Sequence, residues 1–314
     1  PSAGGGGSPG GSQDGSAGSA DPVARARQGS RYRNGVFIGA DAFRRRGPDG
    51  VEGPWHRGFR ESRHDARSLS ARQPAIGAHA FSDRMKPHVT LAETKTADGL
   101  RLTLHEHDGR FAIRLEGQAL MESSLSMSET QLGELGTAHL TRTAACRIMI
   151  GGLGLGFTLK SVLSRMGPKA RIEVTELIPA VVAWNRTFLR DLNGALLEDA
   201  RVKCLAGDVG QHLARTRGPE FDAIILDVDN GPVAMVRKDN GRLYEAAGLQ
   251  HIHAVLKPGG RAAFWSAGTD RTFGKRLAAA GFAVEVVPAR LHAGARRSAA
   301  TLYVGNKPTH PAAK

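Results

Sequence analysis

The sequence predicts an α/β fold in which a doubly wound, mostly parallel sheet follows a small antiparallel β domain. Three observations carry this prediction. A short apolar run at residues 147–150 leads into a glycine turn, a helix-length segment and a second strand that ends in an acid. Strand-like and helix-like segments then alternate as far as residue 304. Before this region, short alternating segments are separated by acid-glycine pairs typical of hairpin turns.

Residues 1–84 differ in composition from the rest of the chain. Gly, Ser, Ala, Pro and Arg dominate there, and apolar residues show little periodicity. We expect this segment to be a disordered extension. It contains no lysine, and the first methionine is Met85, where the composition turns globular. We therefore hypothesise that Met85 is the natural start and that the upstream stretch is a mis-assigned extension.

Residues 85–125 are expected to form the antiparallel β domain. The pairs Asp98-Gly99, Asp108-Gly109 and Glu116-Gly117 mark its turns. They separate four predicted strands at residues 88–91, 100–106, 111–115 and 118–122. A helix is predicted next, at residues 128–139, with Ser126 or Ser128 as its N-cap.

The glycine turn narrows the choice of ligand. Gly151, Gly152, Gly154 and Gly156 leave the backbone free to turn sharply and to approach a ligand closely. A dinucleotide fingerprint would need glycine where Phe157 stands, and no Gly-Lys-Ser/Thr follows to make a P-loop. The spacing therefore favours an adenosyl ligand without a pyrophosphate. An ordinary tight turn is the alternative.

The elements after the turn alternate as a doubly wound sheet requires. Helices are predicted at residues 157–165, 179–192, 249–256 and 273–280. Strands are predicted at residues 171–176, 201–205, 221–227, 261–265, 282–287 and 300–304. A polar, Arg-rich loop joins the last two strands, which suits an antiparallel hairpin at one edge. The ligand-binding domain is assigned to residues 126–307 and a tail to residues 308–314.

Acids stand at three successive strand ends, where ligands bind in such sheets. Glu176 can accept hydrogen bonds from ribose hydroxyls, and Asp208 with the Val209 amide can read an adenine ring. Asp227 would face the centre of the cleft, where it attracts an ammonium group or acts as a general base. The alternatives are a solvated loop acid for Glu176, a helix cap for Asp208 and a turn cap for Asp227.

From Met85 to Val304 the chain resembles the spermidine synthase-like (polyamine aminopropyltransferase) family, which has the Rossmann-like fold of class I S-adenosylmethionine-dependent transferases. The resemblance rests on the small β domain, on Lys257-Pro258-Gly259-Gly260 and on four motifs, at residues 150–156, 174–177, 207–209 and 221–227. It implies that Glu176 contacts the ribose, that Asp208 contacts the adenine and that Asp227 helps to deprotonate the attacking amine. A homodimer is common in the family.

The chain departs from the family pattern in three places. The family has an aspartate in the glycine loop, where this chain has Leu153 or Leu155. A Tyr-His pair on the helix before the first parallel strand is missing from residues 128–134, and the loop after Asp227 is one residue shorter to its proline. Glu129, Glu134 and Asp229 are candidates to replace the lost substrate contacts. Tyr244 is a further candidate, with core or surface packing as its alternative.

These features support three hypotheses. In the first, decarboxylated S-adenosylmethionine donates an aminopropyl group to an amine. In the second, S-adenosylmethionine donates a methyl group to another acceptor, because leucines in the loop would leave the amides of residues 152–155 free for a carboxylate. The third is a nucleotide-sensing protein without catalysis, motivated by the missing substrate motifs. No metal is needed for the first two reactions.

The charge of +13 and the pI of about 10.4 raise the question of an anionic partner. Apart from the extension, the basic residues are scattered, with one loose cluster at Arg290, Arg296 and Arg297. A solvated basic face is therefore favoured over nucleic-acid binding. Cys146 and Cys204 have no metal-ligand or redox spacing. No apolar run approaches the roughly 20 residues of a membrane span, so we expect a soluble, cytoplasmic protein.

Overall fold

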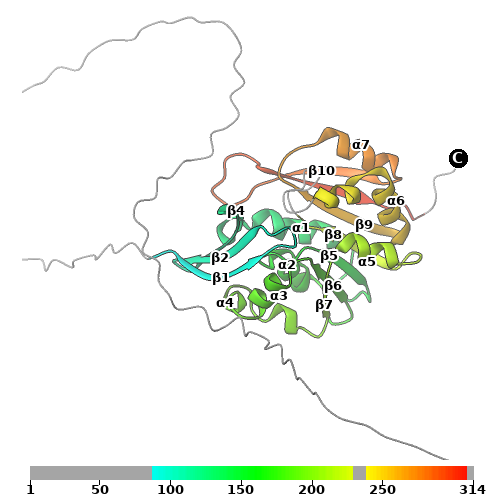
Figure 1. Cartoon of the computed structure of the whole chain (residues 1–314). Coiled ribbons are helices and arrows are strands. Elements are labelled where there is room, and N and C mark those ends of the chain that lie inside the picture. The colour runs from blue at the N-terminus through cyan, green and yellow to red at the C-terminus, as the bar shows by residue number, and fades with distance from the viewer. Residues whose placement is uncertain (1–86, 229–237, 310–314) are drawn as a thin grey trace, which may run out of the picture. The chain divides into compact units, whose positions relative to one another are not determined.

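The computed structural model of the chain describes residues 87–228 and 238–309 (Figure 1). The expected extension at residues 1–84, the substrate candidate Asp229 and most of the expected tail lie outside the described residues. The expected domain boundaries stay predictions.

The first four strands form an antiparallel meander in the order β1-β2-β3-β4. They are β1 (Val89–Lys95), β2 (Arg101–His107), β3 (Arg110–Leu115) and β4 (Gln118–Glu122). Positive φ angles at Asp108 and Gly109, and again at Glu116 and Gly117, give the two tight hairpin turns that the sequence predicts. The meander buries Leu102, Leu104 and Ile113 on one face. The antiparallel β domain is confirmed.

The second sheet has seven strands in the order β10-β11-β9-β8-β5-β6-β7. They are β5 (Arg147–Gly151), β6 (Arg171–Glu176), β7 (Val202–Ala206), β8 (Phe221–Leu226), β9 (Leu256–Ser266), β10 (Ala283–Ala289) and β11 (Ala300–Asn306). Strands β5 to β9 are parallel, whereas β11 runs antiparallel to both β9 and β10. The predicted doubly wound sheet with an antiparallel edge hairpin is therefore confirmed.

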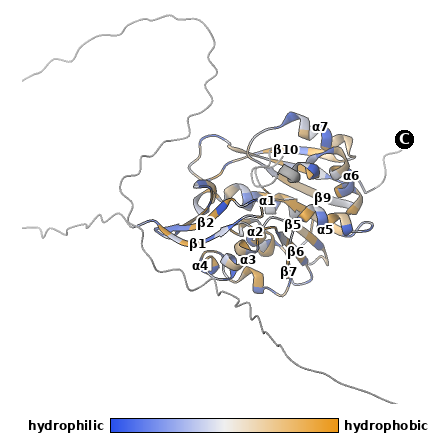
Figure 2. Cartoon of the chain, in the orientation of Figure 1, coloured by the Kyte–Doolittle hydropathy of each residue, from blue (hydrophilic) through white to orange (hydrophobic). Residues whose placement is uncertain are grey.

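Helices cover both faces of this sheet (Figure 1). On one face, residues of α1 (Met127–Thr137), α2 (Phe157–Arg165) and α3 (Pro179–Arg186) share a hydrophobic core with Ile148 and Ile150. On the other face, α5 (Val209–Arg215), α6 (Ala246–Val255) and α7 (Arg271–Ala279) share a second core with Met149. The alternation along β5 follows from the two-residue period of a strand that is buried on both sides. In Figure 2 the hydrophobic colours gather on the central strands.

The helices differ from the prediction in two places. The helix predicted at residues 179–192 is interrupted after Arg186, and a short helix α4 (Arg190–Asn193) follows. The break occurs because the amides of Thr187 and Leu189 both donate to the Trp184 carbonyl, at 3.2 and 2.9 Å, which ends the regular ladder. Helix α5 was not predicted.

The described residues also form short 3₁₀ helices at Ser123–Leu125, Leu196–Glu198 and Lys238–Tyr244. Strands β5 and β8 are neighbours at the centre of the sheet. Strands β6 and β7 are added on one side of β5, and β8 and β9 on the other, so the strand order reverses between β5 and β8. Ligands bind beyond the carboxyl ends of the strands at such a switch point. The predicted site residues at the ends of β5, β6 and β8 therefore belong to one edge.

Candidate active site

The glycine loop after β5 is built for close backbone contact. Gly152, Gly154 and Gly156 have φ angles of 90°, 51° and 90°, a region that side chains disfavour. A Cβ atom at Gly152 would lie 2.1 Å from the Asp227 carbonyl oxygen. The Asp227 amide also donates to the Gly151 carbonyl at 2.8 Å, so the glycine loop and the end of β8 hold each other in place.

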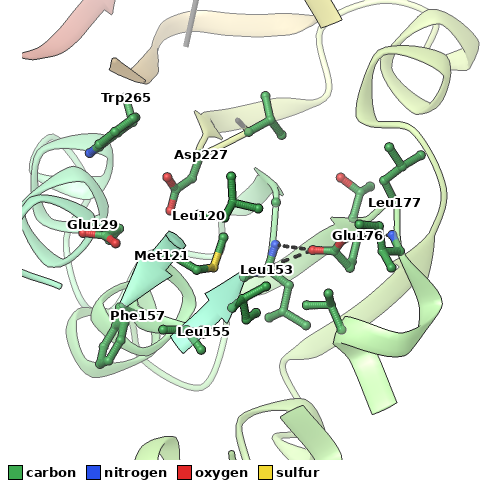
Figure 3. Close-up of a pocket in the computed structure, with 18 of the residues that line it drawn as sticks. Leu120, Met121, Glu129, Leu153, Leu155, Phe157, Glu176, Leu177, Asp227 and Trp265 are labelled. Carbon is green, nitrogen blue, oxygen red and sulfur yellow. Dashed lines mark hydrogen bonds between the residues drawn. The ribbon is translucent and has the colours of Figure 1, made fainter. Parts of the chain in front are cut away.

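Glu176, at the end of β6, binds the glycine loop. Its Oε2 accepts hydrogen bonds from the amides of Leu153 and Gly154 at 3.1 and 3.4 Å, and its Oε1 accepts one from Ile178 at 2.9 Å (Figure 3). Burial raises the pKa of Glu176, although these backbone amides oppose the shift. The Gly152 amide donates to the Thr175 carbonyl at 2.9 Å. The expectation that the loop amides are free for a ligand carboxylate is therefore wrong for residues 152–154.

Asp208 and Val209 border the same cavity as Glu176. Asp208 is the N-cap of α5, where its carboxylate accepts a hydrogen bond from the Gln211 amide at 2.9 Å. The helix-cap alternative for Asp208 is thus realised. A cap and an adenine contact use different oxygens of one carboxylate, so the adenine contact of Asp208 and the Val209 amide stays a prediction.

The cavity at this edge has a volume of about 1330 Å³, including its open mouth. The meander supplies one apolar wall through Leu102, Ile113, Leu120 and Met121. The glycine loop and the ends of β6 and β8 supply the others, and Leu291 from the loop between β10 and β11 completes the lining. The small β domain is therefore part of the site.

The described residues that line the cavity carry acidic groups only. Among the described residues that line it there are five carboxylates and no lysine, arginine or histidine. The acids are Glu122, Glu129, Glu176, Asp208 and Asp227. Buried carboxylates without a cation are costly, because water no longer stabilises their charge. This edge of the molecule is suited to a cationic ligand.

Asp227 and Glu129 form the centre of the acidic group. Asp227 ends β8 and accepts a hydrogen bond from the Thr158 hydroxyl, with 2.6 Å between Oγ1 and Oδ2. Glu129, on the first turn of α1, accepts one from the Ser128 hydroxyl at 2.7 Å. Burial and the negative charge of Glu129 raise the pKa of Asp227 from 3.8 to about 7, and burial also raises the pKa of Glu129. Figure 3 shows both carboxylates on the same side of the cavity, beside Trp265.

No family model matches the chain. A polyamine aminopropyltransferase of Mycobacterium tuberculosis is 31% identical over 115 residues, which are 36% of this chain and 21% of that relative. Polyamine aminopropyltransferase 2 of Streptomyces coelicolor is 29% identical over 179 residues, 56% of this chain and 29% of that relative. The chain thus spans less than a third of the length of the curated relatives it matches.

Solved spermidine synthases share the fold. One, in complex with the transition-state analogue AdoDATO, superposes with a TM-score of 0.56 at 16% identity and covers 71% of this chain and 75% of its own. The enzyme of Thermotoga maritima gives a TM-score of 0.54 at 16% identity, with 71% and 74% covered. The chain shares the fold of spermidine synthases. The sequence comparison confirms its resemblance to polyamine aminopropyltransferases, and the solved structures confirm the expected fold.

Two further candidates from the sequence are Tyr244 and Asp229. Tyr244 is 2% exposed and packs against Phe264 and Phe273, so the structure places it in the core and outside the cavity lining. Its hydroxyl donates to the Val228 carbonyl at 3.4 Å, which links it to the chain segment after Asp227. An acceptor contact for Tyr244, and likewise for Asp229 outside the described residues, stays a prediction. Trp265 lines the cavity near the acids.

Thr158 is the site residue that sequence reasoning missed. It is the second residue of α2 and resembles any other threonine in an amphipathic helix, so no motif distinguishes it. The apolar wall from Leu120 and Met121 was also missed, since these residues read only as strand positions. Among the described residues no group of three or more His, Cys, Asp and Glu side chains is placed to hold a metal ion. No helix among them is long and apolar enough to cross a membrane.

Proposed function

We propose that this protein is a spermidine synthase-like transferase that binds decarboxylated S-adenosylmethionine and transfers its aminopropyl group to an amine. The observation that carries the proposal is the cavity lined by five carboxylates without a described cation. The names of the similar proteins point to the same chemistry, since they are polyamine aminopropyltransferases and spermidine synthases.

The charge of the cavity favours the decarboxylated donor over S-adenosylmethionine itself. The two molecules differ in one carboxylate, which needs backbone amides or a cation to bind. The amides of Leu153 and Gly154 are already bonded to Glu176, and the described lining residues include no cation. A donor that carries only positive charges, on its sulfonium and its ammonium, instead offsets the acids of the cavity.

The glycine loop and Glu176 form the adenosyl end of the site in this proposal. The hydroxyls of a bound ribose would donate hydrogen bonds to the Glu176 carboxylate. The amides of Leu153 and Gly154 already hold this carboxylate in position. Gly152 and Gly154 let the loop pack closely against Asp227 and Met121, because a Cβ atom would lie 2.1 Å from the Asp227 carbonyl oxygen or 2.8 Å from the Met121 sulfur. The donor brings its own sulfonium leaving group, so the protein needs only to align the reactants.

Asp227 and Glu129 form the acceptor end. An amine must lose a proton to attack carbon, and a carboxylate with a pKa of about 7 is well matched to take it near neutral pH. In the transfer a nitrogen–carbon bond forms, the carbon–sulfur bond breaks, its electron pair goes to sulfur, and the released proton goes to Asp227. Glu129 keeps a second negative charge beside the incoming ammonium groups.

Product analysis tests this function. The full chain is incubated with putrescine or spermidine and, separately, with each donor, and the nucleoside product is identified by chromatography and mass spectrometry. We expect 5′-methylthioadenosine and an aminopropylated amine from the decarboxylated donor only. Release of S-adenosylhomocysteine from S-adenosylmethionine would instead show methyl transfer, and binding of a donor without any product would support a non-catalytic sensor. A homodimer and a cytoplasmic location remain part of the proposal.

A further inference from the structure

The Thr158 hydroxyl lies between the two parts of the acceptor end. Its Oγ1 is 2.6 Å from Asp227 Oδ2 and 3.2 Å from the main-chain carbonyl oxygen of Glu129. The side chain is 2% exposed, so water does not compete for these contacts. One buried hydroxyl therefore touches both the general base and the backbone of the residue that carries the second acid.

A threonine hydroxyl has one hydrogen and two acceptor lone pairs. It can donate to only one of the two oxygens at a time. While Asp227 is ionised, the shorter contact to its carboxylate is the charge-assisted one and holds the hydrogen. When Asp227 carries a proton on Oδ2, the hydroxyl can accept from that proton and turn its own hydrogen to the Glu129 carbonyl.

We propose that Thr158 is a positioning residue that follows the proton on Asp227, donating to Oδ2 in the ionised state and to the Glu129 carbonyl oxygen in the protonated state. The Thr158 hydroxyl and Asp227 Oδ2 stay hydrogen-bonded to each other in both states, which matters because unpaired buried polar groups are costly. The proton itself moves only from the acceptor nitrogen to Asp227. The inference rests on the proposed function for its catalytic consequence, but the hydrogen-bond exchange can be measured without turnover.

Thr158 is well suited to hold Asp227 in one orientation, since a β-branched side chain on a helix has few χ1 rotamers. Its helix α2 begins directly after Gly156, so the hydroxyl is tied to the glycine loop that the adenosyl end uses.

Among the described residues, few other titratable groups lie near Asp227. From α1 it is faced by Glu129, from α2 by the neutral Thr158, and from β9 by the neutral Trp265, while Glu176, Asp208 and Glu122 line the same cavity. The charge of Glu129 raises the pKa of Asp227, and the bond from Thr158 lowers it. Removing the Thr158 hydroxyl should therefore raise the pKa of Asp227.

Ser161 provides a matched control. It lies one turn further along α2, is 6% exposed, and donates its hydroxyl to the Thr130 carbonyl of α1 at 2.7 Å. Thr158 and Ser161 thus make the same kind of tie between α2 and α1, but only Thr158 also contacts Asp227. Any effect that comes from loosening the two helices should appear in both variants.

The test is a pH titration of Asp227 by carbon-13 NMR in the full chain labelled at the aspartate carboxyl carbons, with Asp227→Asn used to assign the signal. We expect Thr158→Val and Thr158→Ala to raise the pKa of Asp227 by roughly one to two pH units, since the ionised form loses a hydrogen bond to a charged group. Thr158→Ser should restore the wild-type value, and Ser161→Ala should leave it unchanged.

Activity provides the second readout. In Thr158→Val the pH profile of kcat should move to higher pH in parallel with the NMR titration, while the KM for the donor stays close to wild type. An unchanged Asp227 titration in both hydroxyl-free variants, or an equal shift in Ser161→Ala, would overturn the inference. Absence of turnover in the wild type would count against the proposed function, whereas the NMR result would still decide the role of Thr158.

Discussion

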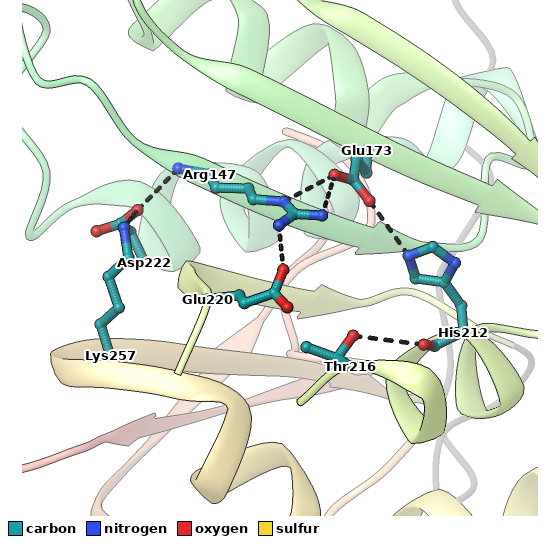
Figure 4. Close-up of polar contacts among 7 residues, drawn as sticks. All are labelled: Arg147, Glu173, His212, Thr216, Glu220, Asp222 and Lys257. Atoms are coloured by element: carbon teal, nitrogen blue, oxygen red, sulfur yellow. Dashed lines mark hydrogen bonds and ion pairs between the residues drawn. The ribbon is translucent and has the colours of Figure 1, made fainter. Parts of the chain in front are cut away.

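The two ends of the parallel sheet use acidic residues in opposite ways. At the amino end, acids lie among basic groups, and each makes a direct contact with one (Figure 4). At the carboxyl end, acids line a cavity to which the described residues bring no cation. The two groups of acids therefore have different roles. The acids at the amino end stabilise the fold, whereas the acids at the carboxyl end are placed to bind a ligand.

Arg147 organises the amino end. Its guanidinium group binds Glu173 at 2.8 Å, pairs with Glu220, and lies 4.9 Å from the centre of the Phe221 ring. His212 reaches the other oxygen of Glu173 at 3.2 Å. Figure 4 shows these contacts joining β5 and β6 with the segment before β8 and with α5. Such a network stabilises the relative positions of the strands.

At the carboxyl end the described residues provide no comparable network of basic partners. Glu176 is satisfied by backbone amides, but Glu129 and Asp227 have only the hydroxyls of Ser128 and Thr158 as described side-chain donors. A raised pKa at Asp227 is the direct consequence. Carboxylates placed close together without a cation destabilise the empty protein. The sheet has them at the edge where a cationic ligand would remove this cost.

The largest expected effect is on catalysis at the carboxyl end. Asp227→Asn removes the base while keeping the shape, and we expect kcat for aminopropyl transfer to fall by roughly 10²- to 10⁴-fold. Glu220→Gln, an acid-to-amide change of the same kind at the amino end, should leave kcat close to wild type. Steady-state kinetics with putrescine and the decarboxylated donor measures both. Similar losses in the two variants would break the comparison.

The next effect is on stability at the amino end. Arg147→Met leaves the buried Glu173 with His212 as its remaining basic neighbour, and we expect the free energy of unfolding to fall by about 1–3 kcal/mol. Urea unfolding at pH 7 measures the change, and donor affinity should be unaffected. If Arg147→Met were as stable as wild type, the amino-end network would have no role in stability.

The smallest effect is on the pH dependence of stability. The native state holds a proton on Asp227 up to pH of about 7, whereas the unfolded chain releases it near 3.8, so this residue makes the empty protein less stable as pH rises through that window. Glu129→Gln removes the neighbouring charge and should lower the pKa of Asp227. We expect the loss of Tm between pH 5 and pH 8 to become smaller by a few degrees. An undiminished loss would show that Glu129 does not act on Asp227.

The sequence predicts the fold well where local signals agree. Helix α2 begins and ends where expected, because Gly156 and the Gly167-Pro168 pair mark its limits. The single helix expected at residues 179–192 is wrong, because Trp184 and Leu189 pack in a hydrophobic core with residues of the meander and the helix is interrupted between them. Local propensity contains no record of such packing.

The sequence predicted which acids lie at the candidate site, but not the groups to which they are hydrogen-bonded. Glu129, Glu176, Asp208 and Asp227 all line the cavity, as strand ends and the missing family acids suggested. The bonds from the loop amides to Glu176 depend on the distance between two loops, and the contact of Thr158 with Asp227 joins residues 69 positions apart. Spacing in the sequence predicts neither contact. The bonds to Glu176 bear on the choice of donor, and the contact of Thr158 bears on the pKa of Asp227.

The most direct test of the central claim is a calorimetric titration of the full chain with S-adenosylmethionine and with its decarboxylated form. If the carboxyl end of the sheet is built for cations, the decarboxylated donor should bind at least about tenfold more tightly, a difference of roughly 1.4 kcal/mol. Equal or tighter binding of S-adenosylmethionine would contradict the account, since its carboxylate would then have found a partner that the acidic cavity is not expected to offer.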